Sequence, residues 1–115
     1  MKATIYHNPR CGTSRNTLEL LEQAGAEIVI VDYLKHPPSK AELTRLYEQA
    51  GLRPSQGLRA KETLAKDLDL VGGHVSENAI LDAMVENPIL IDRPLGETER
   101  GVRLCRPAEK VREIL

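Results

Sequence analysis

The chain has 115 residues, 41% of them hydrophobic, and carries 16 Lys and Arg residues against 17 Asp and Glu residues. This length predicts a single domain, residues 1–115, with a core of its own. A formal net charge of −1 excludes the long-range positive field that attracts nucleic acids or acidic membranes. No apolar run approaches the length of a signal peptide or a membrane span, so we expect a cytoplasmic protein.

The N-terminal third of the chain predicts a βαβ unit. Residues 2–6 are rich in β-branched and aromatic side chains, which favours a short strand. A polar turn follows, and helix signals begin near Thr13 and end at Gly25. Residues 27–33, EIVIVDY, then predict a second, largely buried strand.

The middle of the chain predicts helices. Ser39 and Glu42 form a capping-box pattern at the start of a helix that should end at Gly51. Short helical pieces are expected within residues 53–73, and another helix should follow the capping residue Ser76. We therefore expect a helical insertion after the βαβ unit.

The C-terminal part predicts a hairpin and a last helix. Residues 89–91 and 102–104 are expected as strands, with a polar loop at 96–101 between them. Pro107 suits the first turn of a helix that should run through Ile114. The whole order predicts an α/β fold, namely a thioredoxin-like mixed sheet flanked by helices, with the helical insertion in the middle of the chain.

One cysteine is placed as a reactive residue would be. Cys11 stands between the polar turn and the first helix, where backbone N–H groups and the helix dipole lower the pKa of a thiol. The same N–H groups can hold an oxyanion. His7 and Arg10 could add positive charge nearby. Taken alone, His7 is as compatible with a solvated strand end, and Ser14 with an ordinary first-turn residue.

The cysteine pattern excludes several other classes of site. Cys11 and Cys105 lie at opposite ends of the sequence and are interpreted as free thiols, and no spacing typical of a metal site is present. Ser14 occupies the place of the second cysteine in a dithiol motif, so a second thiol must come from elsewhere. The Cys-x5-Arg loop of phosphatases is excluded because Thr17 stands at the position of its arginine.

Three arginines are candidates for gripping a tetrahedral anion. They stand beside turns or element ends, and guanidinium groups bind oxyanions in a bidentate manner; they are Arg59, Arg93 and Arg106. Taken alone, each is better interpreted as an ordinary surface arginine, and the sequence by itself does not bring the three together. Cys105 follows apolar residues and is predicted to be buried at a strand end.

Three segments together carry a resemblance to a known family. They are HNPRCGTSRNTLELL at 7–21, PILIDRPLG at 88–96 and RLCRPAEKVREIL at 103–115. With them the chain resembles the glutathione- and glutaredoxin-dependent arsenate reductases, and the similarity in element order extends over essentially the whole chain. The resemblance implies that Cys11 attacks arsenate and that arsenate is reduced to arsenite.

The resemblance also implies roles for further residues. The arginines that match the oxyanion-binding positions are Arg59, Arg93 and Arg106. His7 and Ser14 match positions thought to favour the thiolate, and Pro94 matches a proline that follows a cis peptide bond. Electrons would arrive as thiols, with glutathione as co-substrate and glutaredoxin as partner. No tightly bound cofactor and no metal is then expected.

The sequence is also compatible with two other functions. A redox-sensing regulatory protein of the same fold could use Cys11 as an oxidation sensor, although such sensors typically carry the second cysteine that Ser14 replaces. A thiol-dependent reductase of another oxyanion is the other alternative. Arsenate-dependent thiol consumption would indicate the reductase, whereas a stable complex with another protein that changes on oxidation would indicate the sensor.

Overall fold

Two units make up the computed structural model, which describes residues 1–115. The first unit joins the two ends of the chain, residues 1–36 and 93–115, and carries a β-sheet. The second unit, residues 37–92, is helical. None of the helices has both the length and the apolar character that spanning a lipid bilayer requires.

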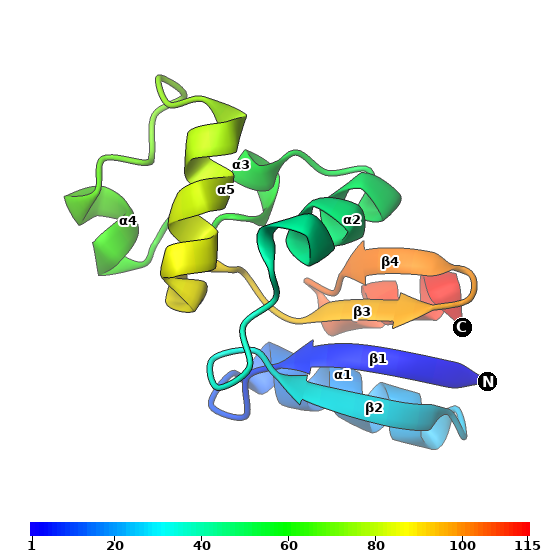
Figure 1. The fold of residues 1–115 in the computed structure, drawn as a ribbon. Helices are drawn as coiled ribbons and strands as arrows, with labels where there is room; N and C mark the ends of the chain where they lie inside the picture. The colour runs from blue at the N-terminus through cyan, green and yellow to red at the C-terminus, as the bar shows by residue number, and fades with distance from the viewer. The chain divides into compact units, whose positions relative to one another are not determined.

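The first unit is built on a mixed sheet of four strands in the order β2-β1-β3-β4 (Figure 1). The strands are β1 (Lys2–His7), β2 (Glu27–Asp32), β3 (Leu95–Thr98) and β4 (Gly101–Leu104). Strand β1 runs parallel to β2 and antiparallel to β3, which in turn runs antiparallel to β4. In the parallel pair His7 lies opposite Asp32, so both strands end at the same edge of the sheet. This is the mixed, thioredoxin-like sheet that the element order predicts.

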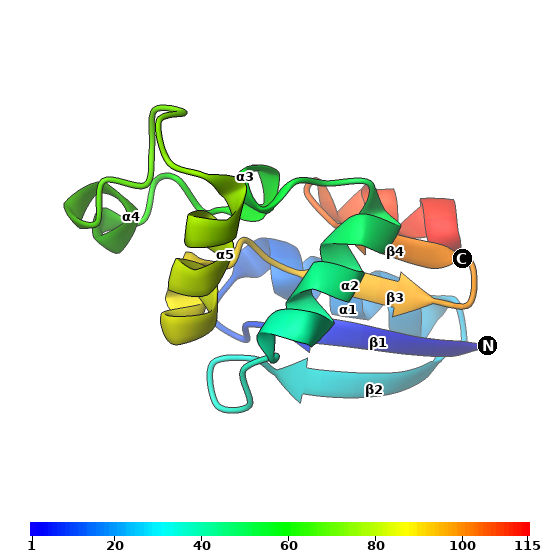
Figure 2. The same cartoon turned by 45° about the horizontal axis from the view of Figure 1, so that its top comes forward.

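One face of this sheet is covered by helix α1 (Gly12–Gln23) and the 3₁₀ helix η2 (Ala108–Ile114), as Figures 1 and 2 show. The two helices contact each other, and η2 also contacts β4. Their shared core with the sheet consists of Ala3, Ile5, Leu21, Cys105, Val111 and Ile114. This cluster contains no aromatic side chain, whereas Tyr6 and Tyr33 are buried elsewhere in the same unit.

The second unit consists of short helices arranged around α5. They are α2 (Lys40–Ala50), α3 (Pro54–Gly57), α4 (Thr63–Asp67), α5 (Glu77–Glu86) and the 3₁₀ helix η1 (Pro88–Leu90). The Ser39 hydroxyl accepts the Glu42 N–H at the start of α2, and the Ser76 hydroxyl accepts the Ala79 N–H at the start of α5. Both predicted capping residues thus begin helices, because each satisfies a backbone donor that the first turn leaves unpaired.

The prediction of a strand at residues 89–91 is wrong, and so is the predicted loop at 96–101. Pro88 begins η1, whose turn is closed by bonds from the Leu90 and Ile91 N–H groups to the carbonyls of Asn87 and Pro88. The strand that pairs with β4 is β3, and only two residues separate these strands. The hydrophobic pattern pointed to the wrong segment because β3, with the sequence LGET, is short and polar.

The prediction that residues 27–33 form a largely buried strand is wrong in its burial. Strand β2 forms there, but Val29 is 56% exposed and Ile30 is 53% exposed. These side chains are exposed because β2 is an edge strand, with β1 as its one neighbour in the sheet.

Candidate active site

The loop after β1 places the Cys11 sulfur at the start of α1. Cys11 is the N-cap of that helix and has an extended backbone, with φ of −94° and ψ of 121°. The Asn8 carbonyl accepts the Cys11 N–H at 3.0 Å, and the Asn8 side-chain oxygen accepts the Arg10 N–H at 3.0 Å. These bonds close a tight turn over Pro9, so the sulfur meets the unpaired amides of the first helical turn.

The surroundings of the Cys11 sulfur favour the thiolate. Burial by itself raises the pKa of this thiol, but hydrogen bonds from the Ser14 N–H, the Arg106 guanidinium and the Thr13 N–H outweigh burial and lower it below the usual value. The positive charge of Arg106 acts in the same direction. Cys11 is partly exposed and can be reached by a reactant. It therefore combines thiolate character with access, which is what a reactive cysteine requires.

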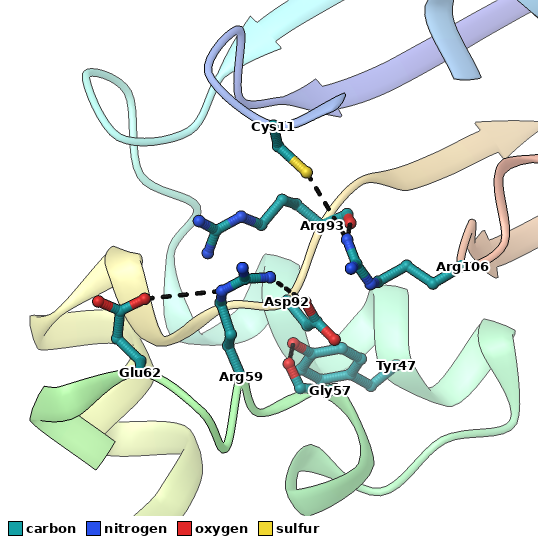
Figure 3. Close-up of polar contacts among 8 residues, drawn as sticks. All are labelled: Cys11, Tyr47, Gly57, Arg59, Glu62, Asp92, Arg93 and Arg106. Carbon is teal, nitrogen blue, oxygen red and sulfur yellow. Dashed lines mark hydrogen bonds and ion pairs between the residues drawn. The ribbon is translucent and has the colours of Figure 1, made fainter. Parts of the chain in front are cut away.

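Arg106 is held against the sulfur by the backbone at Arg93. Its Nη1 atom lies 3.6 Å from the Cys11 Sγ and donates to the Arg93 carbonyl at 2.9 Å (Figure 3). The Arg93–Pro94 peptide bond is cis, and the Arg106–Pro107 bond, which was not predicted from the sequence, is cis as well. The first unit thus brings Cys11, Arg93 and Arg106 together from three distant parts of the sequence.

The side chains of His7 and Ser14 contact each other at the base of the loop that carries Cys11. The His7 Nδ1 lies 2.6 Å from the Ser14 hydroxyl, which also accepts the Asn8 N–H at 3.1 Å. Ser14 is fully buried and His7 is nearly so. Burial lowers the pKa of His7, the Asp32 carboxylate opposes this and Arg15 adds to it. A neutral imidazole can accept the hydroxyl proton at Nδ1, so these two side chains tie the end of β1 to the first turn of α1.

Arg59 belongs to the second unit, where two carboxylates hold it. Its Nη1 atom lies 3.2 Å from an oxygen of Asp92 and its Nε atom lies 3.6 Å from an oxygen of Glu62, as Figure 3 shows. The backbone N–H of Arg59 also donates to the Leu90 carbonyl. The arginine is thereby fixed within its unit, and its role in binding an oxyanion stays a prediction.

Two residues that were not predicted from the sequence as part of the site, Arg15 and Thr13, also support the loop. The Arg15 guanidinium donates to the Pro9 carbonyl at 2.8 Å, across the turn that carries the cysteine. Thr13 contributes one of the N–H groups that stabilise the thiolate. A signal for Arg15 was available, since it lies four residues after Cys11 and therefore on the same side of the first helical turn.

Cys105 is buried, as the sequence predicts. Its side chain is fully enclosed between β4 and η2, and burial raises the pKa of its thiol to about 12. A thiol with this pKa is almost entirely protonated near neutral pH and is a poor nucleophile. The two free cysteines therefore differ in character, and Cys11 is the reactive one.

The arrangement can perform nucleophilic attack on an anion. A thiolate supplies the electron pair, and backbone N–H groups with a guanidinium surround it with donors for negative charge. Among residues 1–115, no three or more His, Cys, Asp or Glu side chains are grouped so that they could hold a metal ion.

The sequence is similar to that of known reductases over its whole length. The profile of the ArsC family matches residues 6–114. An arsenate reductase of Rhizobium meliloti (strain 1021) is 51% identical over 115 residues, which is 100% of this chain and 82% of the relative. An arsenate reductase of Escherichia coli (strain K12) is 45% identical over 112 residues, which is 97% of this chain and 79% of the relative.

The fold is similar to that of a solved reductase as well. The structure of an arsenate reductase from Vibrio cholerae superposes with a TM-score of 0.94 at 45% sequence identity. The match covers 100% of this chain and 98% of that one. Sequence and fold therefore point to the same group of proteins.

Proposed function

The chain belongs to the ArsC family, and on this premise we propose that it is an arsenate reductase with Cys11 as its nucleophile. The relatives named above are arsenate reductases, and the present chain spans about four-fifths of their length. The proposal therefore draws on similarity over the whole chain as well as on the site.

One observation carries the proposal. The Cys11 sulfur, at the N-terminus of α1, is faced by the Arg106 guanidinium at 3.6 Å, and the pKa of its thiol is lowered there. A thiolate beside a fixed cation is suited to attack on an anionic centre, because the cation offsets the repulsion between nucleophile and substrate. A structural cysteine gains nothing from this setting.

Arsenate binding is assigned to the helix N-terminus and the arginines. The amides of the first turn of α1 and the Arg106 guanidinium lie at the sulfur, and Arg93 is buried in the same unit. The family resemblance adds Arg59. Guanidinium groups would hold the arsenate oxygens in a bidentate manner and orient the arsenic atom toward the thiolate.

The first chemical step forms a bond between sulfur and arsenic. The thiolate donates its electron pair to As(V), and one arsenate oxygen leaves as hydroxide, or as water once it has taken a proton. The oxidation state of arsenic is unchanged, and Cys11 carries a thiol–arsenate ester. Arg106 is placed to balance the charge of this adduct.

The second step brings the electrons from an external thiol. A glutathione thiolate attacks the adduct, an S–S bond forms between glutathione and Cys11, and the electron pair of the S–As bond stays with arsenic. Arsenic is thereby reduced from As(V) to As(III), and the two sulfurs are oxidised to a mixed disulfide. Arsenite is released as the S–As bond breaks, and glutaredoxin then takes the glutathionyl group by thiol exchange, which restores the Cys11 thiol. The buried, protonated Cys105 supports an external source of the second thiol.

His7 and Ser14 are assigned as positioning residues. Their side chains are hydrogen-bonded to each other, the Ser14 hydroxyl also accepts the Asn8 N–H, and the backbone N–H of Ser14 donates to the Cys11 sulfur. They would favour the thiolate by fixing the loop in which the sulfur meets its donors.

The proposal is tested by trapping the mixed disulfide. The reduced protein is incubated with arsenate and glutathione without glutaredoxin, and its mass and modified peptide are then measured. We expect one glutathionyl group on Cys11, formed only when arsenate is present. A control with phosphate in place of arsenate should leave the thiol unmodified. Modification of Cys105, or an intramolecular disulfide, would overturn the proposed resolving step.

A further inference from the structure

A concave site lies beside the loop that leads from β1 to Cys11, within the first unit. It is a cavity of about 330 Å³, lined by Asn8, Pro9, Arg10, Asp32, Leu34 and Lys35. The first three residues lead directly into Cys11, and the other three belong to the end of β2 and the turn that follows it. Figures 1 and 2 both show these two loops side by side. In open α/β sheets, the carboxyl ends of parallel strands are where ligands bind.

Both walls of this cavity are fixed by hydrogen bonds. The Asp32 side chain accepts the Leu34 N–H at 3.2 Å, and the Asp32 carbonyl accepts the Lys35 N–H at 3.1 Å. On the opposite wall, the Asn8 side chain accepts the Arg10 N–H. Arg10 and Lys35 are thus held through their backbone amides, and their side chains are exposed. The cavity is therefore a preformed site with two cationic side chains at its surface.

The charges of the cavity match one of the proposed reactants. Glutathione carries two carboxylates and one ammonium group, and the cavity carries two cations, Arg10 and Lys35, and one carboxylate, Asp32. A carboxylate has acceptor capacity for several donors, so Asp32 can receive an ammonium group besides the Leu34 N–H. Leu34, 39% exposed, offers apolar contact for the methylene groups of the tripeptide.

From this arrangement we infer that the cavity binds glutathione, with Arg10 and Lys35 holding its carboxylates and Asp32 its ammonium group. The inference rests on the proposed function, because it assigns a site to the external thiol of that scheme. Arg10 directly precedes Cys11, so a tripeptide held in this cavity is bound at the loop that carries the proposed nucleophile. The side chains here are distinct from the arginines assigned to arsenate, so both reactants can be held at once.

The inference is tested by binding, without turnover. S-methylglutathione keeps both carboxylates and the ammonium group but has no reactive thiol, and its binding can be followed by NMR through the backbone amides of the parent protein. We expect the amides of Arg10, Leu34 and Lys35 to shift. Lys35→Glu, and separately Arg10→Glu, should weaken binding about tenfold or more, the loss of one charge-assisted contact.

A matched control separates this effect from net charge. Lys110→Glu makes the same charge change on η2, away from the cavity-lining residues, and should bind S-methylglutathione like the parent protein. Shifts confined to other parts of the chain, no binding, or equal weakening by Lys110→Glu would each overturn the inference.

Failure of the inference and failure of the proposed function give different results. Glutathione-dependent arsenate reduction with an unchanged KM for glutathione in Lys35→Glu would overturn the cavity assignment and leave the reductase standing. Binding of S-methylglutathione in the cavity without any arsenate-dependent turnover of glutathione would support the cavity and overturn the proposed function. If arsenate reduction requires glutaredoxin and no binding of S-methylglutathione is detected, the inference is overturned. The two loops that line the cavity would then be candidates for contact with glutaredoxin.

Discussion

Cys11 gains its thiolate character from donors that come from two ends of the chain. The Ser14 and Thr13 amides belong to the helix that Cys11 begins, whereas Arg106 follows the last strand. Arg106 is itself positioned by the Arg93 carbonyl at 2.9 Å. The reactivity of the cysteine therefore depends on the fold of the whole first unit as well as on the local helix terminus.

Removing Arg106 should make Cys11 less acidic. The thiolate is the form that reacts, so its alkylation by iodoacetamide rises with pH through the pKa of the thiol and then levels off. Arg106 lowers this pKa, hence Arg106→Ala should move the midpoint of the profile to higher pH. Arg103→Ala, which removes an arginine paired with Glu113, is the control and should keep the parent midpoint. An unchanged midpoint in Arg106→Ala would contradict the role assigned to this contact.

The Ser14 hydroxyl should matter for stability more than for the acidity of Cys11. Ser14→Ala leaves the Asn8 N–H and the His7 Nδ1 without their partner, which should lower the free energy of unfolding by about 1–3 kcal/mol. The residue 14 N–H still donates to the sulfur, so the alkylation midpoint should move less than in Arg106→Ala. Urea unfolding and alkylation measure the two effects. A larger shift of the midpoint in Ser14→Ala would show that the hydroxyl acts on the thiolate directly.

At the scale of elements, the sheet and its two covering helices depend on close packing around Cys105. The Cys105 sulfur lies against Gly96 of β3, where an added Cβ would come within 3.2 Å of it. The same face carries Val111 and Ile114 of η2. A side chain at position 96 would therefore crowd the Cys105 sulfur, which gives a packing reason for a glycine directly after Arg93-Pro94-Leu95.

Cys105→Ala should cost stability and spare activity. The smaller side chain leaves a void in a fully buried position, and the loss in free energy of unfolding should be about 1–2 kcal/mol. Arsenate reduction should continue, because the second thiol is external. Urea denaturation and a turnover assay measure the two quantities. A correctly folded Cys105→Ala protein without activity would identify Cys105 as a resolving thiol.

The sequence predicted the helices that begin at a capping residue or end at a glycine. Ser39 and Ser76 begin helices, and Gly25 and Gly51, with φ of 72° and 71°, follow helix ends where a side chain would be strained. Strand β3 was missed because its pairing with β1 and β4 is a long-range property, and its sequence LGET, with Leu95 as its one aliphatic residue, shows no strand-like alternation.

The site, like the elements, could be predicted from the sequence only where its signal is local. Cys11 has a local signal, a turn before a helix, and its place at the helix N-terminus is confirmed. The approach of Arg106 to its sulfur depends on contacts between residues 95 positions apart, which periodicity cannot reveal. The family resemblance named Arg106, and the structure gives the physical reason for its effect on the thiol.

At the scale of the whole molecule, the residues proposed for arsenate reduction come from both units of the chain. The thiolate and its donors lie in the unit of residues 1–36 and 93–115, and Arg59 lies in the unit of residues 37–92. A net charge of −1 supplies no long-range attraction for an anion, so arsenate must be held by local donors.

Arg59→Ala should therefore affect arsenate binding without affecting the cysteine. We expect the KM for arsenate to rise about tenfold, the loss of one charge-assisted contact. The alkylation profile of Cys11 should stay that of the parent, since the groups that lower its pKa belong to the first unit. Arg45→Ala, which removes an arginine paired with Glu42 on α2, is the control. An unchanged KM in Arg59→Ala would remove Arg59 from the proposed binding set.

The most direct test of the proposed reductase is arsenate-dependent oxidation of NADPH, coupled through glutathione reductase in the presence of glutathione and glutaredoxin. The parent protein should consume NADPH only when arsenate and glutathione are both present, and Cys11→Ser should abolish this consumption while keeping the fold. A folded, reduced parent protein that shows no arsenate-dependent signal, or a Cys11→Ser protein that retains it, would contradict the assignment of Cys11 as the nucleophile of an arsenate reductase.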